Sequence, residues 1–168
     1  MSKTFPIFFG VAVAILALGA WLGWFGTSDS RLTMTGEILK VRSVEMTPET
    51  TLVIADFRMK NESNIVFNLR DAVLLWTDAQ GKEHECDHVA GSDLQRILPH
   101  MPQVGPAFNK PFVIGDKVEA KAMMDRMTSG VAQASEAEFA KRQNVRLRIT
   151  DIDHKTFVFD ERGAPAPK

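Results

Sequence analysis

The stretch Leu52–Lys82, LVIADFRMKNESNIVFNLRDAVLLWTDAQGK, decides the fold class of this chain. In Thr51–Lys60 apolar side chains recur at every second position, which is the period of a strand with one buried face. Asn61–Asn64 has the composition of a turn. Ile65–Leu69 alternates again, and Ala72–Thr77 is apolar enough for a central strand. Short strands separated by polar turns indicate an antiparallel β domain.

The same signals continue on both sides of this stretch. Further strands are expected at Gly36–Val44, Lys82–Val89, Val118–Thr128, Val145–Thr150 and Thr156–Asp160. Two short helices are expected, one capped by Ser92 and ending near Leu98, and one opened by the capping box Ser135–Glu138 and ending near Gln143. About seven strands with turns between them predict an all-β, immunoglobulin-like antiparallel sandwich with one or two short helices.

Composition excludes several classes of protein. The chain has 168 residues, 20 Lys and Arg against 21 Asp and Glu, and a net charge of -1. That length suits one ordinary domain, and the charge balance excludes a generally basic nucleic-acid binder. The single cysteine excludes an intramolecular disulfide and any zinc site with two or more cysteine ligands.

The run Phe5–Phe25, FPIFFGVAVAILALGAWLGWF, carries no charge. As a helix it would span about 32 Å, against about 30 Å for the hydrocarbon core of a bilayer. Trp21 and Trp24 stand at its downstream end, where indole rings favour the headgroup level. We therefore expect an uncleaved transmembrane anchor. The alternative is a signal peptide cleaved after Ala17–Gly19, but the run is longer than the usual apolar region of about 7–15 residues.

The expected organisation follows from this anchor. It comprises a cytosolic tail (1–4), the transmembrane anchor (5–25), a linker (26–35), the β-sandwich domain (36–161) and a flexible tail (162–168). Lys and Arg counts on the two sides do not favour a cytosolic N-terminus. We still expect the domain on the extracytoplasmic side, because the N-terminal tail is tiny and large downstream domains translocate largely regardless of their charge.

The strand–turn–strand pattern of Leu52–Lys82 resembles the immunoglobulin-like sandwiches of the late-embryogenesis-abundant (WHy-type) kind. The whole layout is similar to uncharacterised bacterial single-span membrane proteins that carry such a domain after an anchor. The loop VGPAFNKPFVIGDKV (Val104–Val118) and the late segment RLRITDID (Arg146–Asp153) belong to the same likeness, which covers about Thr35 to Phe159. The resemblance implies a single-pass protein of the bacterial inner (cell) membrane, and it supplies no functional residue.

The string His84-Glu85-Cys86-Asp87-His88 matches the pattern H-E-x-x-H. On a helix both imidazoles could hold one Zn²⁺ while Glu85 activates water, which defines an alternative function as a small membrane-tethered zinc hydrolase. The string follows a turn glycine and has no apolar stripe for a helix to bury, so a polar edge strand is expected instead. In a strand His84 and His88 lie about 13 Å apart and share no ion.

Other candidate ligands have simpler interpretations. Asp151 and Asp153 are expected to form a turn, and no EF-hand spacing follows them. The methionines of the strand expected at Val118–Thr128 are expected to pack in or beside the core, and Cys86 to be a small, partly buried filler. We therefore expect no catalytic residue, no cofactor and no metal. The methionines concerned are Met123, Met124 and Met127.

The expected function is a non-catalytic binding or scaffolding module of the cell envelope. Its candidate protein-binding segment is Pro99–Phe112 (PHMPQVGPAFNKPF), which combines four prolines with apolar side chains. In one interpretation this loop closes the sandwich and buries Phe108 and Phe112 in the core. In the other, at least one of Met101, Val104 and Phe108 is exposed in an apolar contact patch. No nucleic-acid partner is expected.

Overall fold

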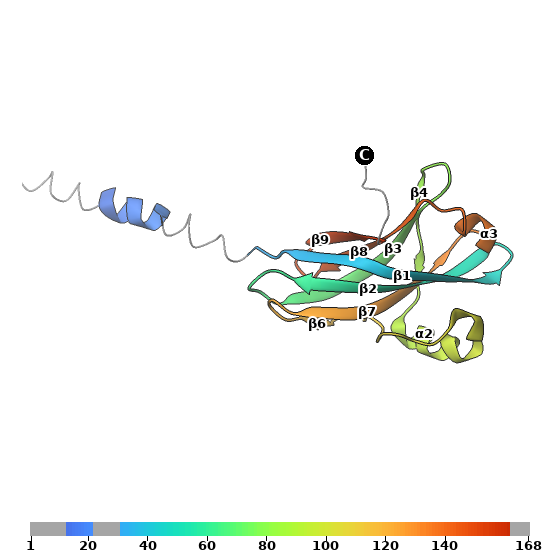
Figure 1. Cartoon of the computed structure of the whole chain (residues 1–168). Coiled ribbons are helices and arrows are strands. Elements are labelled where there is room, and N and C mark those ends of the chain that lie inside the picture. The colour runs from blue at the N-terminus through green and yellow to red at the C-terminus, as the bar shows by residue number, and fades with distance from the viewer. Residues whose placement is uncertain (1–12, 22–30, 162–168) are drawn as a thin grey trace, which may run out of the picture.

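Residues 31–161 form two antiparallel sheets packed face to face in this computed structural model, which describes residues 13–21 and 31–161 (Figure 1). One sheet has the order β1 (Met34–Thr47), β2 (Thr50–Asn61), β7 (Met123–Ala132) and β5 (Asp87–His88). The other has the order β4 (Glu83–Glu85), β3 (Phe67–Thr77), β8 (Asn144–Asp151) and β9 (Thr156–Asp160), and β6 (Lys117–Val118) pairs with β3. The predicted antiparallel β-sandwich is confirmed.

The core between the sheets follows from the alternation in β2. Val53, Ala55, Phe57 and Met59 are fully buried on its inner face. Burying a side chain such as Val53, Phe57 or Met59 contributes roughly 1.5–3 kcal/mol, so this one face stabilises the fold by several kcal/mol. The opposing sheet supplies alternating residues to the same core, among them Leu74, Trp76, Val145, Leu147, Ile149 and Phe159.

The outer face of β2 is also buried. Leu52 and Ile54 pack there with Met127 of β7. They are covered by the helix α2 (Gly91–Ile97) and by the two short 3₁₀ turns that follow it. The turns are η2 (Leu98–His100) and η3 (Pro102–Val104). A third, irregular layer therefore covers the outer face of the four-stranded sheet, and β2 has apolar contacts on both of its faces.

The prediction of a single strand over Lys82–Val89 is wrong. It is divided at Cys86 into β4, which pairs with β3, and β5, which pairs with β7 in the other sheet. The chain crosses between the sheets at the buried Cys86. Gly130 makes the crossing possible, because a Cβ atom there would lie 2.7 Å from the Cβ atom of Cys86.

Several other elements differ from those expected from the sequence. Of the expected strand Ile65–Leu69 only residues 67–69 are extended, and they join Ala72–Thr77 in the single strand β3, with a bulge near Arg70. Val118–Thr128 is broken by a turn between β6 and β7. The expected cap Ser92 is replaced by Ala90, which makes no side-chain cap bond. The capping box of Ser135 and Glu138 is present, but its helix α3 (Glu136–Phe139) is a single turn.

The predicted anchor Phe5–Phe25 lies largely outside the described residues. Residues 13–21 are helical and exposed (Figure 1). No helix among the described residues is long and apolar enough to cross a membrane. The anchor, the linker boundary and the tail 162–168 therefore stay predictions, although β1 already begins at Met34.

Asn61 closes the turn between β2 and β3 from inside the protein. Its fully buried amide donates to the carbonyl oxygens of Ile65 and Val118, at 2.7 and 3.0 Å. Its Oδ1 atom accepts from the backbone N–H and the hydroxyl of Ser63. One side chain thus holds the turn to the segment that contains β6.

We predict that Asn61→Ala lowers the free energy of unfolding by about 2–4 kcal/mol, because it leaves several buried polar groups without partners. Chemical denaturation of the detergent-solubilised chain measures this. The control Asn64→Ala, at an exposed position of the same turn, should stay within about 0.5 kcal/mol of the wild type. Equal effects of the two substitutions would contradict this role of Asn61.

Candidate functional site

A buried ion pair lies on the outer face of the four-stranded sheet. Arg42 of β1 stands opposite Ile54 of β2 and therefore diagonal to Asp56, and Arg42 Nη2 lies 2.7 Å from Asp56 Oδ2. Their side chains are only 7% and 4% exposed. Buried charges are costly unless further hydrogen bonds satisfy them, so the other contacts of this pair matter.

These contacts come from the loop Pro99–Phe112. Arg42 Nη1 donates to the carbonyl oxygens of Val104 and Pro106, at 3.1 and 2.9 Å. Asn109 donates through Nδ2 to the second oxygen of Asp56, at 3.0 Å. The loop is therefore fastened to both members of the ion pair.

Phe108 stands between these fastening points and is 56% exposed. Lys40 Nζ and the guanidinium carbon of Arg42 both lie 4.9 Å from the centre of its ring. Cation–π contacts of this kind are worth about 0.5–1 kcal/mol at exposed sites. They hold the ring in place while leaving more than half of its surface open to solvent.

The two interpretations of the loop are each right in part. Phe112 is buried in the core, edge-on to Phe57 with ring centres 5.6 Å apart. Val104 is buried beneath the loop and Met101 is partly buried. The interpretation that buries Phe108 is wrong, because β1 offers two cations outside the core to receive that ring.

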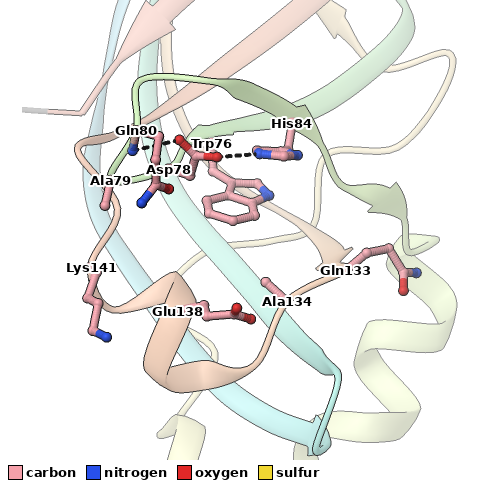
Figure 2. A pocket seen from close by; sticks show the side chains of 9 residues that line it. All are labelled: Trp76, Asp78, Ala79, Gln80, His84, Gln133, Ala134, Glu138 and Lys141. Carbon is pink, nitrogen blue, oxygen red and sulfur yellow. Dashed lines mark hydrogen bonds and ion pairs between the residues drawn. The ribbon is translucent and has the colours of Figure 1, made fainter.

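A separate pocket of about 340 Å³ lies at the end of the sandwich where β3 ends (Figure 2). The indole of Trp76 lies at its centre and stacks on the imidazole of His84, with ring centres 4.7 Å apart. Trp76 is buried, and its Nε1 atom has no hydrogen-bond partner. The remaining wall is polar and comes from the β3–β4 turn, the end of β7 and α3. It comprises Asp78, Ala79, Gln80, Gln133, Ala134, Glu138 and Lys141.

Both acids that line this pocket, Asp78 and Glu138, are engaged in local structure. Asp78 Oδ2 lies 2.8 Å from His84 Nε2, while Asp78 Oδ1 accepts the N–H groups of Gln80 and Lys82. The hydrogen bond from His84, followed by the one from the Lys82 N–H, lowers the pKa of Asp78. Glu138 is held by the capping box. Asp78 and His84 therefore form a hydrogen-bonded pair in the wall of this pocket.

The H-E-x-x-H string does not form the helical geometry that a zincin requires. His84 lies in β4, beside Trp76, and His88 lies in β5 on the other sheet. Glu85 Oε2 accepts from Arg148 Nη2 at 2.9 Å. His84 and Glu85 thus share β4 but have different partners, and His88 lies on the other sheet.

The other candidate ligands serve structural roles. Asp151 is buried, and its carboxylate accepts the N–H groups of Asn68 and Asp153. Burial raises the pKa of the Cys86 thiol to about 12. Within 13–21 and 31–161, no group of three or more His, Cys, Asp or Glu side chains is placed to hold a metal ion. Of the three methionines, Met127 is buried, Met124 is partly buried and Met123 is exposed.

Sequence reasoning missed Arg42 and Asp56. The available signal was Asp56 itself, a carboxylate inside the apolar run LVIADF. A charge at such a position needs a buried partner. The alternation of the strand predicted that Asp56 points away from the sandwich core, but it did not predict the third layer that covers Asp56.

The sequence matches no protein-family model and no curated protein. Similar solved structures include YcdA of Bacillus subtilis, a predicted lipoprotein (12% identity, TM-score 0.46), which covers 79% of this chain, while this chain spans only 37% of YcdA. Another is an uncharacterised β-sandwich protein of Clostridium difficile 630 (9% identity, TM-score 0.34, covering 77% of this chain and 80% of that one).

We predict that Asp78→Asn lowers stability at neutral pH. Because the folded-state pKa of Asp78 is depressed, its contribution is present above its unfolded pKa of about 3.9 and is lost as pH falls through the folded value. The difference in unfolding free energy between the variant and the wild type should thus be present at pH 7 and shrink as the pH falls below about 4. Asp71→Asn, at an exposed position of β3, is the control, and a pH-independent difference for Asp78→Asn would refute the prediction.

Proposed function

We propose that the chain is a membrane-anchored, extracytoplasmic binding or scaffolding module of the bacterial cell envelope, non-catalytic, with a WHy-type immunoglobulin-like sandwich. Its protein-binding surface is the loop Pro99–Phe112. The observation that carries the proposal is the exposed ring of Phe108 on a loop that is fastened to a buried ion pair.

A loop that is already fixed in one conformation can bind a partner at little entropic cost. Ordering a flexible loop on association costs free energy, and a loop already fixed by hydrogen bonds avoids most of that cost. Arg42 and Asp56 on the sheet fix this loop, the latter through its hydrogen bond with Asn109, and the prolines of the loop limit its unfolded conformations. The exposed residues beside Phe108 are small or polar, which leaves the ring as the main apolar contact. They include Pro106, Ala107 and Lys110.

The composition of the patch also suits protein recognition. Aromatic and arginine side chains dominate the binding energy of protein interfaces. Phe108 supplies the aromatic ring, and Lys40 supplies an exposed charge at its rim. The anchor at Phe5–Phe25 would restrict partners to those that reach the membrane surface.

A photo-crosslinking amino acid in place of Phe108, in the full chain expressed in intact cells, tests the proposal. We expect one defined adduct from position 108 and none from Met46, an exposed apolar residue of β1. Phe108→Ala should abolish capture of the same partner by chemical crosslinking while lowering stability by only about 1 kcal/mol.

Phe112→Ala is the matched control. Phe112 is buried, so its loss should cost about 3–5 kcal/mol of stability. At temperatures where that variant is still folded, it should capture the partner. If position 108 gives no more crosslinked product than position 46, the proposed binding surface is wrong.

A further inference from the structure

Three segments meet around the start of β3, at the end of the sandwich where β1 begins (Figure 1). Gly115 donates its N–H to the carbonyl oxygen of Leu69 at 2.8 Å, on one edge of β3. Ile152 donates its N–H to the carbonyl oxygen of Asn68 at 3.0 Å, on the other edge. The loop before β6, the β8–β9 turn and the β2–β3 turn are thus joined at one end of the molecule.

Each of these segments carries an exposed aliphatic residue. Ile114 is 72% exposed, Ile152 is 61% exposed, and Val66 is 38% exposed. Single exposed aliphatic residues are ordinary, but three on adjoining segments at one end of a domain form a patch that indicates a contact surface. We call Val66, Ile114 and Ile152 the end patch.

Exposed cations surround the end patch. Lys117 stands opposite Asn68 in the β6–β3 pair, Lys121 follows β6, and Lys155 lies in the β8–β9 turn. Arg70 contacts His154 in that turn. The acidic side chains nearby are partly neutralised, since Glu62 pairs with Lys60 and Asp116 with Arg126. Asp71, Asp153 and Glu119 are exposed acids in the same region.

The path of the chain brings this end close to the proposed anchor. Leu32 is buried in the core, and β1 starts at Met34. From Phe25 to Leu32 even a fully extended chain spans only about 25 Å. With Phe5–Phe25 in the bilayer, the end that carries the patch is therefore the end that the tether holds near the lipid.

We propose that the end patch rests on the bilayer that holds the anchor. Ile114, Ile152 and Val66 enter the headgroup region, and the surrounding lysines and Arg70 pair with anionic lipid headgroups. Apolar side chains flanked by cations are the combination that binds such interfaces. This contact rests on the proposed anchoring and goes beyond it, because it orients the sandwich and directs the Trp76 pocket away from the membrane.

The test uses the full chain in vesicles of phosphatidylcholine with phosphatidylglycerol. Ile114→Cys and Glu49→Cys, an exposed position in the β1–β2 turn at the opposite end, are each labelled with an environment-sensitive dye. Burial of the native thiol of Cys86, which also raises its pKa to about 12, keeps it unlabelled. Lipids with a spin label at headgroup depth then quench any dye that contacts the bilayer.

We expect several-fold stronger quenching and a blue-shifted emission for the dye at position 114, and neither for the dye at position 49. Introducing Ile152→Asp should reduce the quenching at position 114 with an unchanged circular dichroism spectrum. If the chain floats with the vesicles but the two dyes behave alike, the end-patch contact is wrong while the anchor stands. If the chain does not float, the anchor and this contact both fail.

Discussion

The ion pair of Arg42 and Asp56 is the constraint on which the outer layer of this protein depends. Removing two charges from water costs several kcal/mol per ion, and their attraction offsets this only when the remaining hydrogen-bonding atoms are satisfied. Here the carbonyl oxygens of Val104 and Pro106 and the amide of Asn109 satisfy most of these atoms, while Arg42 Nε is buried without a hydrogen-bond partner. The loop therefore cannot leave the sheet without exposing its ion pair, and the pair cannot stay buried without the loop.

This coupling explains why β2 is buried on both faces. Its inner face belongs to the sandwich core, and its outer face is covered by α2 and the loop. The result is a sandwich with a third, irregular layer, from which Phe108 projects. The same fold places the aliphatic residues of the end patch and several lysines at the end of the sandwich where β1 begins. We therefore infer two surfaces, the end patch for lipid and the loop that carries Phe108 for a protein partner.

Local sequence signals predicted the parts of the fold that depend on neighbours in the chain. The alternation around Phe57 identified an inner face, Thr156–Asp160 is the strand that the pattern predicts, and the Ser135 capping box is present. Features set by distant contacts were not predictable. The crossing at Cys86 depends on Gly130 in another strand, and the partner of Asp56 lies in β1. The exposure of Phe108 likewise follows from cations that only the fold brings to it.

Hydrogen exchange on Arg42→Met tests most directly whether the ion pair holds the loop. We predict faster exchange of the amides in residues 104–110, while the amides of β8 keep their protection. Arg58→Met, which removes the more exposed pair with Asp125 on the same sheet, should leave the loop unchanged. Unaltered protection of the loop in Arg42→Met, or equal loss of protection in β8, would contradict the account.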